Sequence, residues 1–167
     1  MRKVYCIAIL CFFGTIGFAQ NVAMVNGKAI DSKEFLWFFK KNHAGTASVS
    51  YNELMSYLNL YINFKLKVLD AIELKLDKDT AYLAEIKKYE TALQAQKRLS
   101  DKSTEYSYIM NEYKEAVLMF NISELKVWNK APDGEAQVKL EKEWIEGLRK
   151  RYPVKINQEQ IKKMAKP

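Results

Sequence analysis

The sequence predicts a mainly helical domain with a small β-sheet that joins the two ends of the mature chain. Long segments carry apolar residues at every third or fourth position, which is typical of the buried face of a helix. Strand-like stretches occur only near the ends, at 22–25, 28–30 and 154–156. Because a two-stranded hairpin is marginal alone, we expect the third stretch to pair with it.

The first 19 residues have the three-part pattern of a secretory signal peptide. Arg2 and Lys3 precede an apolar run over 4–13, and small residues follow up to Ala19. The run is shorter than the roughly 20 apolar residues of a membrane span. We therefore expect cleavage near Ala19 and a soluble exported protein without a stable membrane anchor.

The mature chain, 167 minus 19 residues, has 148 residues at 20–167, which is enough for a single domain. Cys6 and Cys11 would leave with the leader, so we expect no disulfide. Removal of the two leader cations lowers the formal charge from +7 to +5. Lysine greatly outnumbers arginine, so this mild charge favours acidic clients or lipid headgroups, and no nucleic acid is expected as a partner.

The hairpin leads directly into the first helix. Asn26 and Gly27 are the residue types that best adopt the two positive φ angles of a type I′ turn. Asp31 offers a side-chain cap, and Glu34 three residues later completes a pattern that resembles a capping box. A helix of about three turns, which contains the apolar run 35–39, is expected to follow.

The segment 51–76 predicts one long helix at the centre of a bundle. Two lines of apolar residues give it two apolar faces, so more than one neighbour must cover it. No Gly or Pro interrupts the segment, so we expect a continuous helix. The first line contains Leu54, Leu58, Tyr61, Ile62, Leu69, Ile72 and Leu76, and the second Tyr57, Leu60, Phe64, Val68 and Ala71.

A third helix is expected after the break at 77–80. Either Asp79 or Thr80 can cap it with a side-chain oxygen. The segment 98–105 is polar except for one leucine and predicts a connection or a kink. The inner face of the third helix is predicted to contain Tyr82, Ile86, Tyr89 and Leu93.

The remaining sequence predicts two more helices and the closing strand. A fourth helix is expected over 106–130, and the turn signal Pro-Asp-Gly at 132–134 separates it from a fifth helix over 135–151. The alternating stretch 154–156 follows as a strand. The last residues, 158–167, are expected to form a basic tail.

The residues do not offer a catalytic constellation. His43 is the only histidine, so a two-histidine metal site or a Cys–His pair cannot form within one mature chain, and a solvated loop residue is expected there. Acidic residues mostly alternate with lysine along the predicted helices, which is typical of solvated faces. We expect no catalytic residue, no metal site, no cofactor and no enzymatic activity.

The first helix carries more apolar residues than one buried stripe holds. Successive helical residues lie 100° apart, so the run 35–39 covers more than half the circumference. We expect Trp37 or Phe38 to be partly exposed, with Tyr57 or Tyr61 of the central helix across a groove. Exposed apolar patches mark binding surfaces, so these four residues are the candidate client-binding residues.

Several segments together resemble the SurA-like periplasmic foldases, a family of peptidylprolyl isomerases. The resemblance covers nearly all of the mature chain, and its most specific stretches are 60–77 and 141–157. It implies a SurA-N-like helical bundle in which an N-terminal part, 20–99, and a C-terminal part, 105–157, form one periplasmic chaperone core. The segments include "YINFKLKVLDAIELKLDKD", "YLAEIKKYETAL", "EYKEAVLMFNISELKVWNKA" and "LEKEWIEGLRKRYPVKIN".

The chain departs from the longer family members where these carry parvulin-type isomerase domains. That place holds only "SDKST" at 100–104, and a second family segment is missing around 132–134. The resemblance therefore implies a periplasmic holdase for unfolded, aromatic-rich outer-membrane or secreted polypeptides, without isomerase catalysis. The alternative is a structural or adaptor protein that associates with itself or with a full-length homologue.

Overall fold

A computed structural model describes residues 20–43, 49–96 and 100–165 of the chain. These residues are mainly helical and include a small three-stranded antiparallel sheet, as predicted. The predicted signal peptide, with its cleavage point and both cysteines, lies outside the described residues. In chain order the elements are β1 (Asn21–Val25), β2 (Lys28–Asp31), α1 (Ser32–Asn42), α2 (Tyr51–Glu73), the 3-10 turn η2 (Leu76–Lys78), α3 (Thr80–Ala95), α4 (Thr104–Ser123), the π-helical turn η3 (Glu124–Trp128), α5 (Gly134–Arg151), β3 (Val154–Ile156) and α6 (Gln158–Met164).

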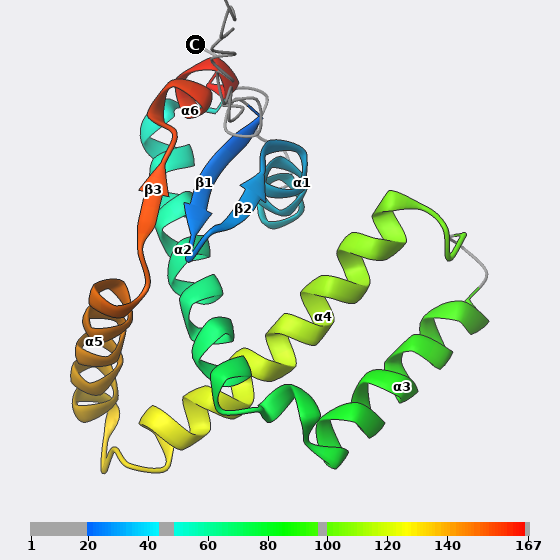
Figure 1. The fold of residues 1–167 in the computed structure, drawn as a ribbon, viewed down its shortest axis with the longest axis vertical. Helices are drawn as coiled ribbons and strands as arrows, with labels where there is room; N and C mark the ends of the chain where they lie inside the picture. The colour runs from blue at the N-terminus through cyan, green and yellow to red at the C-terminus, as the bar shows by residue number, and fades with distance from the viewer. Residues whose placement is uncertain (1–19, 44–48, 97–99, 166–167) are drawn as a thin grey trace, which may run out of the picture.

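The sheet joins the two ends of the described chain, which confirms the predicted pairing (Figure 1). β1 lies between β2 and β3 and runs antiparallel to both. Asn26 and Gly27 have φ angles of 49° and 76°, the left-handed values that a type I′ turn requires. The backbone N–H of Asn26 donates to the carbonyl of Pro153 at 2.8 Å, so the hairpin turn is also tied to the start of β3.

The capping of α1 follows the prediction only in part. The Asp31 side chain accepts hydrogen bonds from the backbone N–H groups of Lys33 and Glu34, at 2.8 and 3.2 Å. Glu34 does not complete a capping box, because its carboxylate is directed to Lys65 on α2. The reciprocal pair occurs instead at the start of α2, between Ser50 and Glu53.

Helix α2 is the central element of the structure. It contacts α1, α4, α5, α6 and β1, and it runs without a break, as predicted (Figure 1). It ends at Glu73, three residues earlier than expected, because Lys75 adopts a left-handed φ of 60° and Leu76 starts a 3-10 turn. Leu60 also differs from the prediction, since 66% of it is exposed although it belongs to an expected inner line.

Helices α3 and α4 run side by side as an antiparallel pair that extends away from the sheet (Figure 1). The rings of Tyr89 and Tyr113 stack between them with centroids 3.6 Å apart. The Tyr113 hydroxyl donates to Glu85 at 2.5 Å.

The ends of these two helices compare with the prediction as follows. Asp79, one of the two predicted candidates, caps α3. The regular part of the predicted fourth helix ends at residue 123, and the next five residues continue as the π-helical turn η3.

Helix α5 is fixed to α2 through the buried carboxylate of Asp70. This side chain accepts a hydrogen bond from the Trp144 indole at 2.9 Å and from the Arg151 guanidinium at 3.1 Å. The ammonium of Lys126, from η3, lies 3.7 Å away. A buried carboxylate is tolerated only when such partners replace its lost hydration, so this cluster fixes the position of α5 and η3 against α2.

The segment predicted as a basic tail instead contributes helix α6. Asn157 caps this helix by accepting from the backbone N–H of Gln160 at 3.1 Å. Ile161 is fully buried and packs in the same core as the sheet and α2. A seven-residue helix with so few apolar positions has no detectable periodicity, which explains why the sequence analysis missed it.

Replacing Ile161 by Ala is expected to lower the free energy of unfolding by about 2 to 4 kcal/mol, because it removes a fully buried side chain from the core. Val138→Ala provides the control, since Val138 is 71% exposed and its change should stay within about 0.5 kcal/mol. Urea unfolding followed by circular dichroism measures both. A loss below about 1 kcal/mol for Ile161→Ala would show that α6 does not belong to the core.

Candidate functional site

A groove of about 320 Å³ lies between α1, α2 and α4. Its size is at the lower end of the range for ligand sites, so it accommodates a short segment or one or two side chains. Three of the four residues predicted to bind clients, Phe38, Tyr57 and Tyr61, are in its lining. The complete lining consists of Phe38, Asn42, Tyr57, Leu60, Tyr61, Phe64, Glu112, Glu115 and Ala116.

Helix α2 supplies an aromatic wall to the groove. Tyr57, Tyr61 and Phe64 follow one another at spacings of four and three residues, which places them on one helix face. Their rings are nearly parallel, with angles of 11° and 15° and centroid separations of 6.4 and 6.0 Å between successive rings. Phe38 of α1 lies 5.4 Å from the Tyr61 ring. The wall of the groove is therefore aromatic, and Tyr57 and Phe64 are its partly exposed rings.

The four predicted residues differ in exposure. Trp37 and Tyr57 are partly buried, whereas Phe38 and Tyr61 are core residues with only 3% and 7% of their surface exposed. Trp37 is thus the partly exposed ring that the prediction required, but it is outside the groove lining. Its indole packs edge-on against Phe38 and lies 5.6 Å from the Tyr108 ring of α4. The large exposed apolar side chain of the groove is Leu60.

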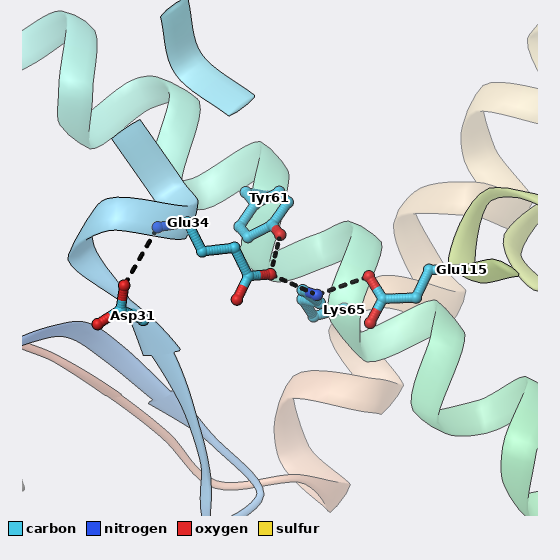
Figure 2. A network of polar contacts seen from close by, with 5 residues as sticks. All are labelled: Asp31, Glu34, Tyr61, Lys65 and Glu115. Carbon is cyan, nitrogen blue, oxygen red and sulfur yellow. Dashed lines mark hydrogen bonds and ion pairs between the residues drawn. The ribbon is translucent and has the colours of Figure 1, made fainter. Parts of the chain in front are cut away.

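A polar network connects the three helices beside the aromatic wall, as Figure 2 shows. The Tyr61 hydroxyl donates to Glu34 Oε1 at 3.0 Å. The Lys65 ammonium lies 3.4 Å from the same oxygen of Glu34 and 2.6 Å from Glu115 Oε2. Because Glu34 is on α1 and Glu115 on α4, the single ammonium of Lys65 holds both helices to α2.

Burial shapes the electrostatics of this network. Desolvation raises the pKa of Glu115, although the nearby Lys65 ammonium opposes this effect. Burial also raises the pKa of Tyr61, so its hydroxyl remains protonated and donates to Glu34. Farther along α4, Glu112 forms an ion pair with Lys41 of α1. Glu115 is therefore partly desolvated, and it shares its ammonium partner with Glu34.

The acidic residues of this site do not follow from the sequence prediction. Acidic residues on the predicted helices are expected to be solvated partners of lysine, but Glu112 and Glu115 have no lysine three or four positions away in either direction. That lack of a partner along the helix is a signal that could have distinguished them. The exposure of Leu60, in contrast, depends on where α4 crosses α2, which no local pattern specifies.

His43 is packed more closely than a solvated loop residue. It is exposed, but its ring stacks on Phe39 with a centroid separation of 4.2 Å and stands edge-on to Tyr57.

In the part of the chain that the structure describes, no three His, Cys, Asp or Glu side chains gather closely enough to hold a metal ion. Within the same residues, none of the helices combines the length and the apolar character that crossing a membrane requires.

Comparisons of the chain with protein-family models, with curated proteins and with solved structures found no match. The fold and the groove define the chain only as a mainly helical protein with a small antiparallel sheet and an aromatic groove beside its central helix. The SurA-like resemblance stays a prediction. The groove is therefore the feature of the structure that bears on the function of the chain.

Replacing Lys65 by Met is expected to lower the free energy of unfolding at pH 7 by roughly 1 to 3 kcal/mol, because Glu34 and Glu115 lose the ammonium that they share. Loss of the ammonium removes the effect that opposes desolvation at Glu115, so the folded-state pKa of that carboxyl rises further. The deficit of the variant relative to the parent chain should therefore shrink as the pH falls towards 5 and a carboxylate takes up a proton.

Urea unfolding of both chains at pH 7 and pH 5 measures this difference. Lys87→Met is the control, because Lys87 is an exposed partner of Glu90 on α3 and its loss should change stability by less than about 0.5 kcal/mol. An equal deficit of the Lys65 variant at the two pH values would contradict the shared ion pair as its cause.

Proposed function

We propose that the chain is a periplasmic chaperone of the holdase type, which binds unfolded outer-membrane or secreted polypeptides without isomerase catalysis. The observation that carries this proposal is the groove between α1, α2 and α4, where aromatic rings lie beside an exposed leucine, Leu60. Exposed apolar surface in a concave site favours an apolar ligand. The predicted signal peptide and the SurA-like resemblance support the periplasmic location.

The size of the groove favours weak and exchangeable binding. Full burial of a Leu- or Phe-sized side chain contributes about 1.5 to 3 kcal/mol. A disordered segment loses conformational entropy when it is ordered on a surface, which offsets part of this gain. A groove of about 320 Å³ holds only one or two such side chains, so each contact is short-lived. Rapid exchange suits a protein that shields many different unfolded segments.

Two further aromatic side chains, Phe120 of α4 and Trp128 of η3, are partly exposed beyond the groove. Ala116 lines the groove, and Phe120 follows it by four residues on the same face of the helix. The Phe120 ring packs edge-on against Trp128 of η3 with centroids 5.0 Å apart, and the two residues remain 49% and 37% exposed. An unfolded chain that enters the groove would find further apolar contacts there, which supports binding of extended segments over binding of a small molecule.

Replacing Leu60 by Ser is expected to weaken client protection severalfold and to leave the unfolding midpoint nearly unchanged, because a side chain that is 66% exposed has little burial to lose. Leu83→Ser is the matched control, since it makes the same change at an exposed position on α3 outside the groove lining. Light scattering of an unfolded outer-membrane barrel protein, diluted from urea, measures protection.

Three outcomes contradict the proposal. Unchanged aggregation of the client at a few-fold molar excess of the parent chain would rule out the holdase function itself. Equal protection by the Leu60 and Leu83 variants would place client binding outside the groove. A stable complex of fixed stoichiometry with itself or with a full-length homologue, seen by size exclusion with light scattering and without client protection, would establish the adaptor role instead.

A further inference from the structure

We propose that the groove selects client segments in which an arginine or lysine stands next to an apolar residue. The cationic group would lie between the aromatic wall of α2 and the carboxylates of Glu112 and Glu115, while the apolar neighbour would contact Leu60. This inference rests on the proposed function and names the class of segment that the same site takes.

The charge of the groove is opposite in sign to the charge of the chain. The whole sequence has a formal charge of +7, which by itself favours acidic partners. Among the described residues that line the groove, however, the charged ones are Glu112 and Glu115. They lie three residues apart on α4, so both carboxylates are on the helix face that contributes to the groove. Local charge therefore favours a cation.

The carboxylates are not fully neutralised by the chain itself. Glu34 and Glu115 share the single ammonium of Lys65, and Glu112 pairs with Lys41, so within the described ion pairs three carboxylates have two ammonium groups. Lys28 of β2 also acts on Glu115 from a distance, but it lowers the pKa of that carboxyl less than Glu34 raises it. A further cation in the groove would relieve this imbalance.

Lysines of the chain already show the expected binding mode. The Lys65 ammonium lies 5.0 Å from the centroid of the Tyr61 ring and 2.6 Å from Glu115. On α1, the Lys41 ammonium lies 5.4 Å from the Trp37 ring and pairs with Glu112. Each ammonium thus combines an aromatic face with a carboxylate, a combination that stabilises a partly desolvated cation. A client guanidinium in the groove would meet the same two kinds of group.

A larger hollow between α2, η3 and α5 lacks this preference. It has a volume of about 540 Å³ and also contains apolar side chains such as Val138. Its charged lining residues balance, because two carboxylates accompany two cations. That hollow therefore provides no net sign by which to select a client, in contrast to the groove beside α4. Its charged lining residues are Glu141, Lys142, Glu146 and Arg149.

A series of short peptides tests the inference directly. Fluorescein-labelled peptides of about eight residues, blocked at both ends, carry one Phe next to one variable residue, which is Arg, citrulline or Glu. Citrulline keeps the shape of arginine without its charge. Fluorescence anisotropy should show the Arg peptide binding about tenfold more tightly than the citrulline peptide, with the Glu peptide weaker still.

Matched variants locate the preference. In Glu112→Gln/Glu115→Gln, the ratio of Arg to citrulline affinity should fall below about twofold, because the carboxylates that hold the cation are gone. Glu141→Gln/Glu146→Gln, which makes the same change in the other hollow, should retain the full ratio. If the first double variant does not fold, Glu112→Gln alone is used, since that side chain is 28% exposed and its change should be tolerated.

The outcomes separate this inference from the proposed function. Equal affinity for the Arg and citrulline peptides, or a preference that survives in the Glu112 and Glu115 variants, overturns the selection of basic segments. So does the absence of any peptide binding. If light scattering still shows client protection in those cases, the proposed function stands and only the selectivity fails. If protection is also absent, both are wrong.

Discussion

The structure depends on the need to cover α2, whose apolar residues occupy more of its circumference than one neighbour can bury. The sheet, α1, α5 and α6 cover one part of this surface, and α4 covers another. Leu60 remains exposed between α1 and α4 because these helices approach α2 without closing over that position. The candidate groove is thus the part of the helix surface that the other elements leave uncovered, and its aromatic character comes from the same residues that form the core.

Two polar clusters determine how the covering helices are placed. Lys65 holds α1 and α4 through Glu34 and Glu115 (Figure 2), while Asp70 holds α5 and η3 through hydrogen bonds and ion pairs. Apolar contacts supply most of the stability but little direction, whereas a partly buried carboxylate requires a partner in a specific place. The Lys65 cluster therefore has two consequences: it fixes the width of the groove, and it leaves negative charge beside the aromatic wall.

Local patterns in the sequence predicted most of the fold. The Asn26-Gly27 turn, the Asp31 cap and the long apolar period of α2 each depend on neighbouring residues, and the structure confirms them. Helix α6 was missed because it is short, and its stability comes from tertiary packing of Ile161. The candidate site likewise combines a part that a local pattern predicts and a part that depends on tertiary packing. Its rings lie on one helix face, but the roles of the acidic residues depend on how α4 crosses α2.

The central claim is that unfolded polypeptides bind in the groove beside Leu60, and site-specific photocrosslinking tests it most directly. A benzophenone side chain is introduced at position 60 or, as the control, at position 83, because both native leucines are exposed. Each purified chain is illuminated with an unfolded outer-membrane barrel protein. The account predicts crosslinks to the client from position 60 and few from position 83. Equal crosslinking at the two positions, or crosslinking mainly from position 83, would contradict it.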